Sequence, residues 1–94
     1  MKLILCKQCN DVVRLMTNDI RFCKCKASAG VYIDNINAIF SGVHCIPLGI
    51  DNTTLSKAVH RRETIYYDNT FQAFIVHEYS ETFKRVDNVE TSKK

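Results

Sequence analysis

Four cysteines in two close pairs constrain the fold of this chain more than any other feature. Cys6 and Cys9 enclose two residues, Cys23 and Cys25 enclose one, and thirteen residues separate the pairs. Each pair supplies two soft ligands from one tight turn, and two such turns joined by a hairpin complete the tetrahedral shell that zinc prefers. The spacing therefore predicts one structural Zn²⁺ bound by Cys6, Cys9, Cys23 and Cys25. The alternatives are a redox dithiol and four ordinary cysteines.

The length of the chain makes such a site useful. At 94 residues we expect a single domain, and a metal or disulfides often supplement the core of so short a chain. The apolar start at residues 3–5 is too short for a signal peptide, which favours a cytoplasmic protein with reduced thiols and a metal in place of disulfides. The fifth cysteine, Cys45, is expected to be a buried small residue on a strand, otherwise an accessory thiol.

The residue after each second ligand bears on the geometry of the two turns. That position often needs a positive φ, which glycine adopts most readily. Here it is held by Asn10, which tolerates this region, and by Lys26, which tolerates it poorly. We therefore expect the second turn to differ somewhat from the first.

The rest of the pattern predicts an α+β protein that is mostly β, with an N-terminal four-cysteine zinc ribbon, β-hairpins and one short helix. Strands are expected at 11–16, 20–22, 31–34, 38–41 and 45–50, with Pro47 placing the last at a sheet edge or a strand end. Capping residues at 51–54 predict a helix over about 53–62. Residues 69–86 fit either strands or a helix. One domain is expected over 1–87, and a flexible tail over 88–94.

Several short stretches carry a resemblance to a known family. Cys6-Lys-Gln-Cys9, Phe22-Cys23-Lys-Cys25, the run from Ile46 to Asn52 and the run from Phe71 to Val76 resemble a family of small, mostly uncharacterised zinc-ribbon proteins of bacteriophages and prophages. The resemblance spans roughly residues 4–86, and the cysteine pattern is its sharp part. It implies a fold element, a viral setting in the host bacterial cytoplasm, and a strand at 71–77.

The charge balance bears on nucleic-acid binding. The formal net charge is +3, with a surplus of four positive charges in residues 1–26 and one negative charge in excess over 27–94. Four thiolates and one zinc ion would lower the total to about +1, which leaves little positive field for a phosphate backbone. A nucleic-acid-binding or transcription-associated module is therefore the alternative function. Its candidate residues are basic: Arg14, Arg21, Lys24, Lys26, Arg61 and Arg62.

Protein binding is the function that the sequence favours. No phosphate loop, nucleophile elbow or second metal motif is present, so we expect no enzyme and no catalytic residues. The aromatic-rich stretch at 65–71 is the candidate partner surface because tyrosines bury well at interfaces and tolerate water. Its proposed contact residues are Tyr66, Tyr67 and Phe71, and the equal alternative is that the tyrosines only bracket a hairpin. In a phage setting the partner would be a host protein, such as a transcription or antiviral-defence component.

Overall fold

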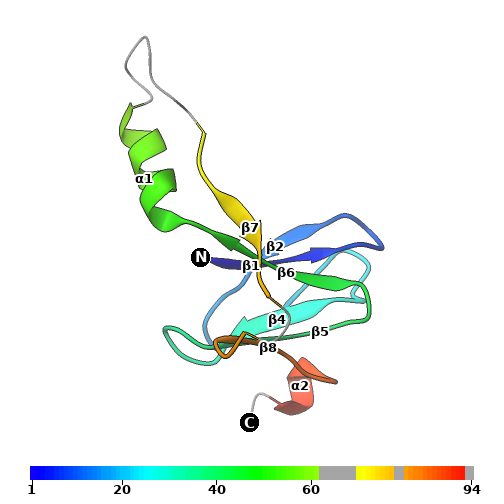
Figure 1. Ribbon diagram of the computed structural model, residues 1–94. Coiled ribbons are helices and arrows are strands. Elements are labelled where there is room, and N and C mark those ends of the chain that lie inside the picture. Colours follow the sequence, from blue (N-terminus) through cyan, green and yellow to red (C-terminus); the bar gives the residue numbers. More distant parts are fainter. Residues whose placement is uncertain (62–69, 78–79, 93–94) are drawn as a thin grey trace.

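The structure is a computed structural model that describes residues 1–61, 70–77 and 80–92. Two four-stranded sheets and one ten-residue helix confirm the mostly β, α+β prediction (Figure 1). The strands are β1 (Lys2–Cys6), β2 (Val12–Arg14), β3 (Arg21–Phe22), β4 (Ala29–Tyr32), β5 (Ala38–Ser41), β6 (Cys45–Ile50), β7 (Ala73–Ile75) and β8 (Phe83–Arg85). The helices are α1 (Asn52–Arg61) and α2 (Val89–Ser92).

The first sheet has the order β2-β1-β6-β7 and is antiparallel throughout. Its central ladder joins β1 to β6 over the whole length of β1, from Lys2 opposite Gly49 to Cys6 opposite Cys45. No strand was predicted at residues 2–6, although the apolar run Leu3-Ile4-Leu5 is typical of one. This ladder gives the sheet two ends, one at the cysteines and the other at the N-terminus.

The second sheet has the order β3-β4-β5-β8. The β4–β5 hairpin confirms the predicted pairing across residues 35–37, and β8 runs parallel to β5. The described part of region 69–86 therefore contains two short strands, and it does not form the helix that was the alternative.

The core lies between the two sheets. It combines residues of the first sheet such as Ile4 and Val13 with Phe40 and Phe83 of the second. The rings of Phe40 and Phe83 are both fully buried and meet edge to face, with centroids 5.1 Å apart. Aromatic pairs of this geometry add to the free energy gained from burying their area. The strand β8, far along the chain, is therefore tied directly to the central core.

Pro47 lies in β6, between β1 and β7, and the expectation that it marks an edge is wrong. Its carbonyl accepts a hydrogen bond from Val76 N at 2.9 Å. Because N and O of a strand residue point to the same side, the proline nitrogen also faces Val76, one residue past the end of β7. The missing N–H of Pro47 therefore lies just beyond the last paired residues of β6 and β7, and no hydrogen bond between these two strands is lost.

The predicted tail over 88–94 needs a correction. Val89 opens the helical turn α2 and is only 1% exposed, packed with Val31 and Ile39 on the face of the second sheet opposite the core. Asn88 caps the turn, since its side-chain oxygen accepts a hydrogen bond from Glu90 N at 2.8 Å. A single apolar residue in a polar segment was too weak a pattern to predict this packing.

The helix α1 starts at Asn52, one residue earlier than expected, and ends at Arg61. The Asp51 carboxylate accepts a hydrogen bond from Thr53 N, as an N-cap does. Thr54 Oγ1 accepts one from Gln72 N at 2.9 Å, which ties the start of the helix to the chain entering β7. We call α1 and residues 70–75 the arm. Figure 1 shows α1 projecting from the two sheets, and the molecule measures 49 × 27 × 23 Å.

Candidate metal centre

The two cysteine turns close with matching hydrogen bonds. Cys6 N donates to Asp11 O at 2.9 Å, and Cys23 N donates to Ser28 O at 3.0 Å, so each turn spans the same number of residues. The first ligand of each pair lies at the end of a strand. Cys6 is the last residue of β1, and Cys23 directly follows β3. The short strands β2 and β3 connect the two turns, but they belong to different sheets. The predicted hairpin is therefore wrong as a strand pair, and a single antiparallel bridge between Met16 and Asp19 remains of it.

Both turns contain a left-handed residue after the second ligand. Asn10 has φ of 59° and Lys26 has φ of 63°. The expectation of a different second turn is therefore wrong at this residue, since Lys26 adopts the same conformation as Asn10. A lysine there costs roughly 1–2 kcal/mol relative to the right-handed conformation. The closed turn, including Lys26 N donating to Cys23 O at 3.0 Å, holds the residue in this conformation.

The four sulfur atoms lie together as a ligand set. All four Sγ atoms are within 4.8 Å of one another. Cys25 Sγ is 3.7 Å from Cys6 Sγ and 3.5 Å from Cys23 Sγ. Four sulfurs at about 2.3 Å from a tetrahedral ion stand about 3.8 Å apart. The cysteines that the sequence singled out are therefore close enough to hold a metal ion.

Ser28 places a buried amide and a buried hydroxyl beside this set. Ser28 N donates to Cys23 Sγ at 3.3 Å. The fully buried Ser28 hydroxyl lies beside Cys6 and, as the largest effect, lowers the pKa of that thiol to about 6. Its oxygen has no hydrogen-bond partner in the part of the chain that the structure describes. A thiolate at Cys6 gives this buried donor its acceptor, so Ser28 suits ligated sulfur better than a thiol.

The remaining two ligands show why the set needs a cation. The Cys25 amide is the main cause that lowers the pKa of Cys9. The Ala27 amide lowers the pKa of Cys25, but burial and the three neighbouring cysteines together raise it to about 12. Adjacent thiolates repel one another, so the fourth cannot ionise unless positive charge is present. A divalent cation at the centre supplies that charge and allows all four thiolates to form.

Cys45 lies next to the ligand set without belonging to it. It is fully buried on β6, as predicted, and stands opposite Cys6 in the ladder. Burial is the main cause that raises the pKa of Cys45 to about 11. The thiol therefore stays protonated, and Cys45 packs as a small apolar residue beside Cys6.

The predicted basic residues that the structure describes lie at both ends of the β1–β6 ladder. Arg21, Lys24 and Lys26 are exposed around the cysteine turns. Arg61 ends α1 (Figure 1), and the helix begins where β6 ends, at the opposite end of the ladder. Arg14 lies on β2 and lines a cavity described below. Arg62 is outside the described residues.

The predicted partner surface is described in part. Phe71 is 45% exposed, and Tyr66 and Tyr67 lie outside the described residues. Sequence reasoning missed Phe74 and Ile75, which are 53% and 73% exposed although they form β7. The β-forming run at 73–76 does not show by itself which of its side chains are exposed, and only the position of β7 at a sheet edge reveals this.

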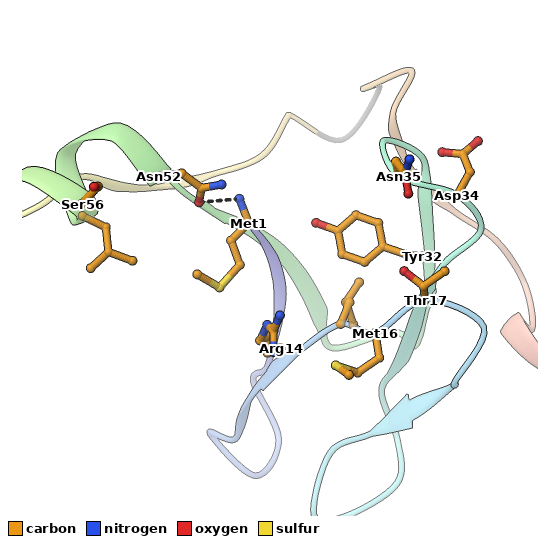
Figure 2. A pocket seen from close by; sticks show the side chains of 11 residues that line it. Met1, Arg14, Met16, Thr17, Tyr32, Asp34, Asn35, Asn52 and Ser56 are labelled. Atoms are coloured by element: carbon orange, nitrogen blue, oxygen red, sulfur yellow. Dashed lines mark hydrogen bonds between the residues drawn. The ribbon is translucent and has the colours of Figure 1, made fainter.

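A cavity of about 520 Å³ lies at the N-terminal end of the ladder, between the start of α1 and the β4–β5 hairpin (Figure 2). Two of its charged groups, the Met1 ammonium and the Asp34 carboxylate, have hydrogen-bond partners. The Met1 ammonium donates to Asn52 Oδ1 at 3.1 Å, and the Asp34 carboxylate accepts three hydrogen bonds within its own hairpin turn. The Tyr32 hydroxyl accepts one from Lys2 N at 2.9 Å. The cavity is lined by both polar and apolar side chains.

Comparison of the chain with protein-family models, curated proteins and solved structures finds no match. Among the described residues, no helix has the length and apolar character needed to cross a membrane. The function must therefore be argued from the cysteine centre and from the exposed surfaces.

Proposed function

We propose that this is a small, non-enzymatic zinc protein that acts by binding another protein through its arm. In the phage setting implied by the resemblance, the partner is a host protein, and binding serves host takeover or inhibition of an antiviral defence system. The observation that carries the proposal is the exposure of large apolar side chains on the arm. Val59, Phe71, Phe74 and Ile75 are 45–73% exposed.

The choice of zinc follows from the donor set. Four thiolates in a tetrahedral arrangement suit Zn²⁺, whereas Mg²⁺ and Ca²⁺ prefer oxygen. Four protein ligands leave no open position for substrate or water, so such an ion is structural. A site of this kind supports a fold and supplies no catalytic group. The reducing cytoplasm of a bacterial host would keep the ligands as thiolates.

The arm suits a partner because its apolar groups lie at one end of the molecule. Clustered apolar side chains on the surface of a small protein mark interaction sites more often than scattered ones do. Phe71 and Phe74 belong to the residue types that anchor interfaces. The cysteine centre is at the other end of the β1–β6 ladder, so partner binding need not disturb the metal.

Zinc content and partner capture test the two halves of the proposal. The purified reduced chain should contain one zinc per chain by elemental analysis, and less than about half a zinc without oxidation would contradict the metal assignment. Affinity capture from bacterial cells should recover one host protein. The variant carrying Tyr66→Ala, Tyr67→Ala and Phe71→Ala should lose it while keeping zinc.

Val43→Ala is the matched control for the capture experiment. Val43 is 90% exposed but lies in the β5–β6 connection near the cysteine end, so its removal should leave capture unchanged. Loss of capture by the control as strongly as by the triple variant would contradict an arm-specific surface.

The exposed basic residues around the cysteine turns favour the alternative, a nucleic-acid-binding or transcription-associated module. Under that alternative the chain would bind DNA or RNA with steep salt dependence, and Arg21→Ala with Lys24→Ala would weaken binding. Under the protein-binding proposal, nucleic-acid binding is weak and the double variant still captures its partner.

A further inference from the structure

The four outer strands of the two sheets differ in charge. Strands β2, β3 and β8 each contain a lysine or arginine: Arg14, Arg21, Lys84 and Arg85. Charged residues on an edge strand discourage pairing with another chain. The fourth edge, β7, has the sequence Ala-Phe-Ile, and all three residues are exposed. No Asp, Glu, Lys or Arg occurs anywhere from 70 to 77.

The hydrogen bonds of β7 show which backbone groups face outward. Gln72 O accepts from Asp51 N and Val76 N donates to Pro47 O, both at 2.9 Å, so residues 72 and 76 point their backbone groups toward β6. Because these directions alternate along a strand, the N–H and C=O of Ala73 and Ile75 point away from β6. Within the described residues no strand lies on that side.

These outward groups match a second copy of the same strand. When two β7 strands lie antiparallel with Phe74 opposite Phe74 of the other copy, Ala73 of each faces Ile75 of the other. Both residues of such a pair have outward N–H and C=O groups, so each pair exchanges two backbone hydrogen bonds. The small side chain of Ala73 leaves room for the larger Ile75 of the other copy on the same face.

The position of Phe74 fits this register. A Cβ atom on Gly49 would come within 2.6 Å of the Phe74 ring, so the ring lies over Gly49 and leans toward β6. Phe74 is nevertheless 53% exposed, so about half of the side chain is accessible for contact with its counterpart across the twofold axis. Aromatic residues opposite one another at a position without hydrogen bonds approach closely and stabilise antiparallel pairs.

We propose that the chain forms a twofold homodimer in which β7 pairs antiparallel with β7 of a second copy, centred on Phe74. The pairing joins the two first sheets into one continuous sheet. An uncharged strand meets its own copy without like-charge repulsion, and the exchange of small and large residues is self-complementary, as a twofold contact requires. The dimer covers Phe74 and Ile75, so Val59 and Phe71 are the apolar side chains of the arm that remain for the host protein.

Sedimentation of the zinc-loaded full-length chain over a range of concentrations tests the dimer. The wild type should reach twice the 10.8 kDa mass of one chain and dissociate on dilution. Ile75→Lys, which puts a charge at the edge, should remain monomeric, with at least a tenfold weaker association. Val43→Lys places the same charge at a 90% exposed site remote from β7 and should still form the dimer.

Amide hydrogen exchange on the wild type keeps the proposal testable if Ile75→Lys misfolds. Protection of the Ala73 and Ile75 amides should rise with protein concentration, while that of Val43 should not. A wild type that stays monomeric at every concentration overturns the proposal, as does an Ile75→Lys variant that folds and associates as tightly as the wild type. Concentration-independent exchange at both amides overturns it too. Phe71→Ala should lower host capture and leave the dimer intact, which separates this proposal from the host-binding one.

Discussion

The two ends of the β1–β6 ladder are built in opposite ways. At the Cys6–Cys45 end, the side chains converge inward, and buried donors such as Ser28 serve the ligand sulfurs. At the Lys2–Gly49 end, the chain leaves the sheets in the arm, and large apolar side chains face outward. The contrast teaches that this chain stabilises itself at one end and leaves the other available for contact.

The largest expected effect comes from removing one ligand at the cysteine end. Cys25→Ser deletes an exposed thiolate with little loss of packing. Structural zinc contributes about 10–16 kcal/mol in zinc-finger peptides, so an impaired site should cost several kcal/mol of unfolding free energy. Zinc content should fall well below one per chain, and thermal unfolding followed by circular dichroism should shift strongly downward. Cys45→Ala is the control: it should retain one zinc, and its loss of zinc would place Cys45 among the ligands.

A smaller effect is expected in the core that both ends share. Phe83→Ala removes a fully buried ring from its contact with Phe40. Such truncations cost about 3–5 kcal/mol, partly through the cavity left behind. Denaturant unfolding of the zinc-loaded protein should give this loss while zinc stoichiometry stays at one. A loss under about 1 kcal/mol would mean that the two sheets do not depend on this contact.

The β4–β5 turn offers a milder, pH-dependent test. Hydrogen bonds from the Asn37 side chain and from the Asn37 and Ile36 amides lower the pKa of Asp34 to about 2, against 3.8 for an unperturbed group. Because the folded-state pKa is the lower one, the stabilisation is present above about pH 4 and is lost as pH falls toward 2. Asp34→Asn should therefore unfold more easily than wild type at neutral pH. Carboxyl chemical shifts should titrate near 2, and a midpoint near 3.8 would contradict the bonded turn.

The smallest effect is expected on the arm. Val59→Ser changes a side chain that is 48% exposed on α1, so the unfolding free energy should shift by no more than about 0.5 kcal/mol. The same substitution type at a core site provides the contrast, since Val31→Ser puts a hydroxyl where the side chain is fully buried. If Val59→Ser destabilised the protein as much as Val31→Ser, the arm would be part of the folding core.

Local patterns in the sequence predicted the elements that depend on neighbouring residues. The cysteine spacing indicated the ligand set, and Asp51 and its neighbours indicated the helix start. The strand-like stretches on either side of residues 35–37 indicated the hairpin. The helix start and the hairpin depend on contacts within a short stretch of chain. The ligand set depends on the need of one zinc ion for four soft ligands.

Such patterns could not predict which strands pair when they lie far apart in the sequence. Nothing in residues 2–6 specifies β6 as a partner, and nothing in Phe83 specifies a parallel pairing with β5. Val89 is one apolar residue in a polar segment, and its burial depends on the second sheet already being formed. The exposure of β7 likewise follows from its place at an edge, because its composition alone is typical of a buried strand.

The position of Cys6 has a consequence for how fast the chain can fold. Cys6 belongs to the ligand set with Cys25 and also pairs with Cys45 in the central ladder. An ion that joins Cys6 to Cys25 roughly halves the length of free chain that must close before β1 meets β6. Each halving of a flexible loop lowers the entropic cost of closure by about 0.6 kcal/mol. Early metal capture should therefore speed the pairing of β1 with β6.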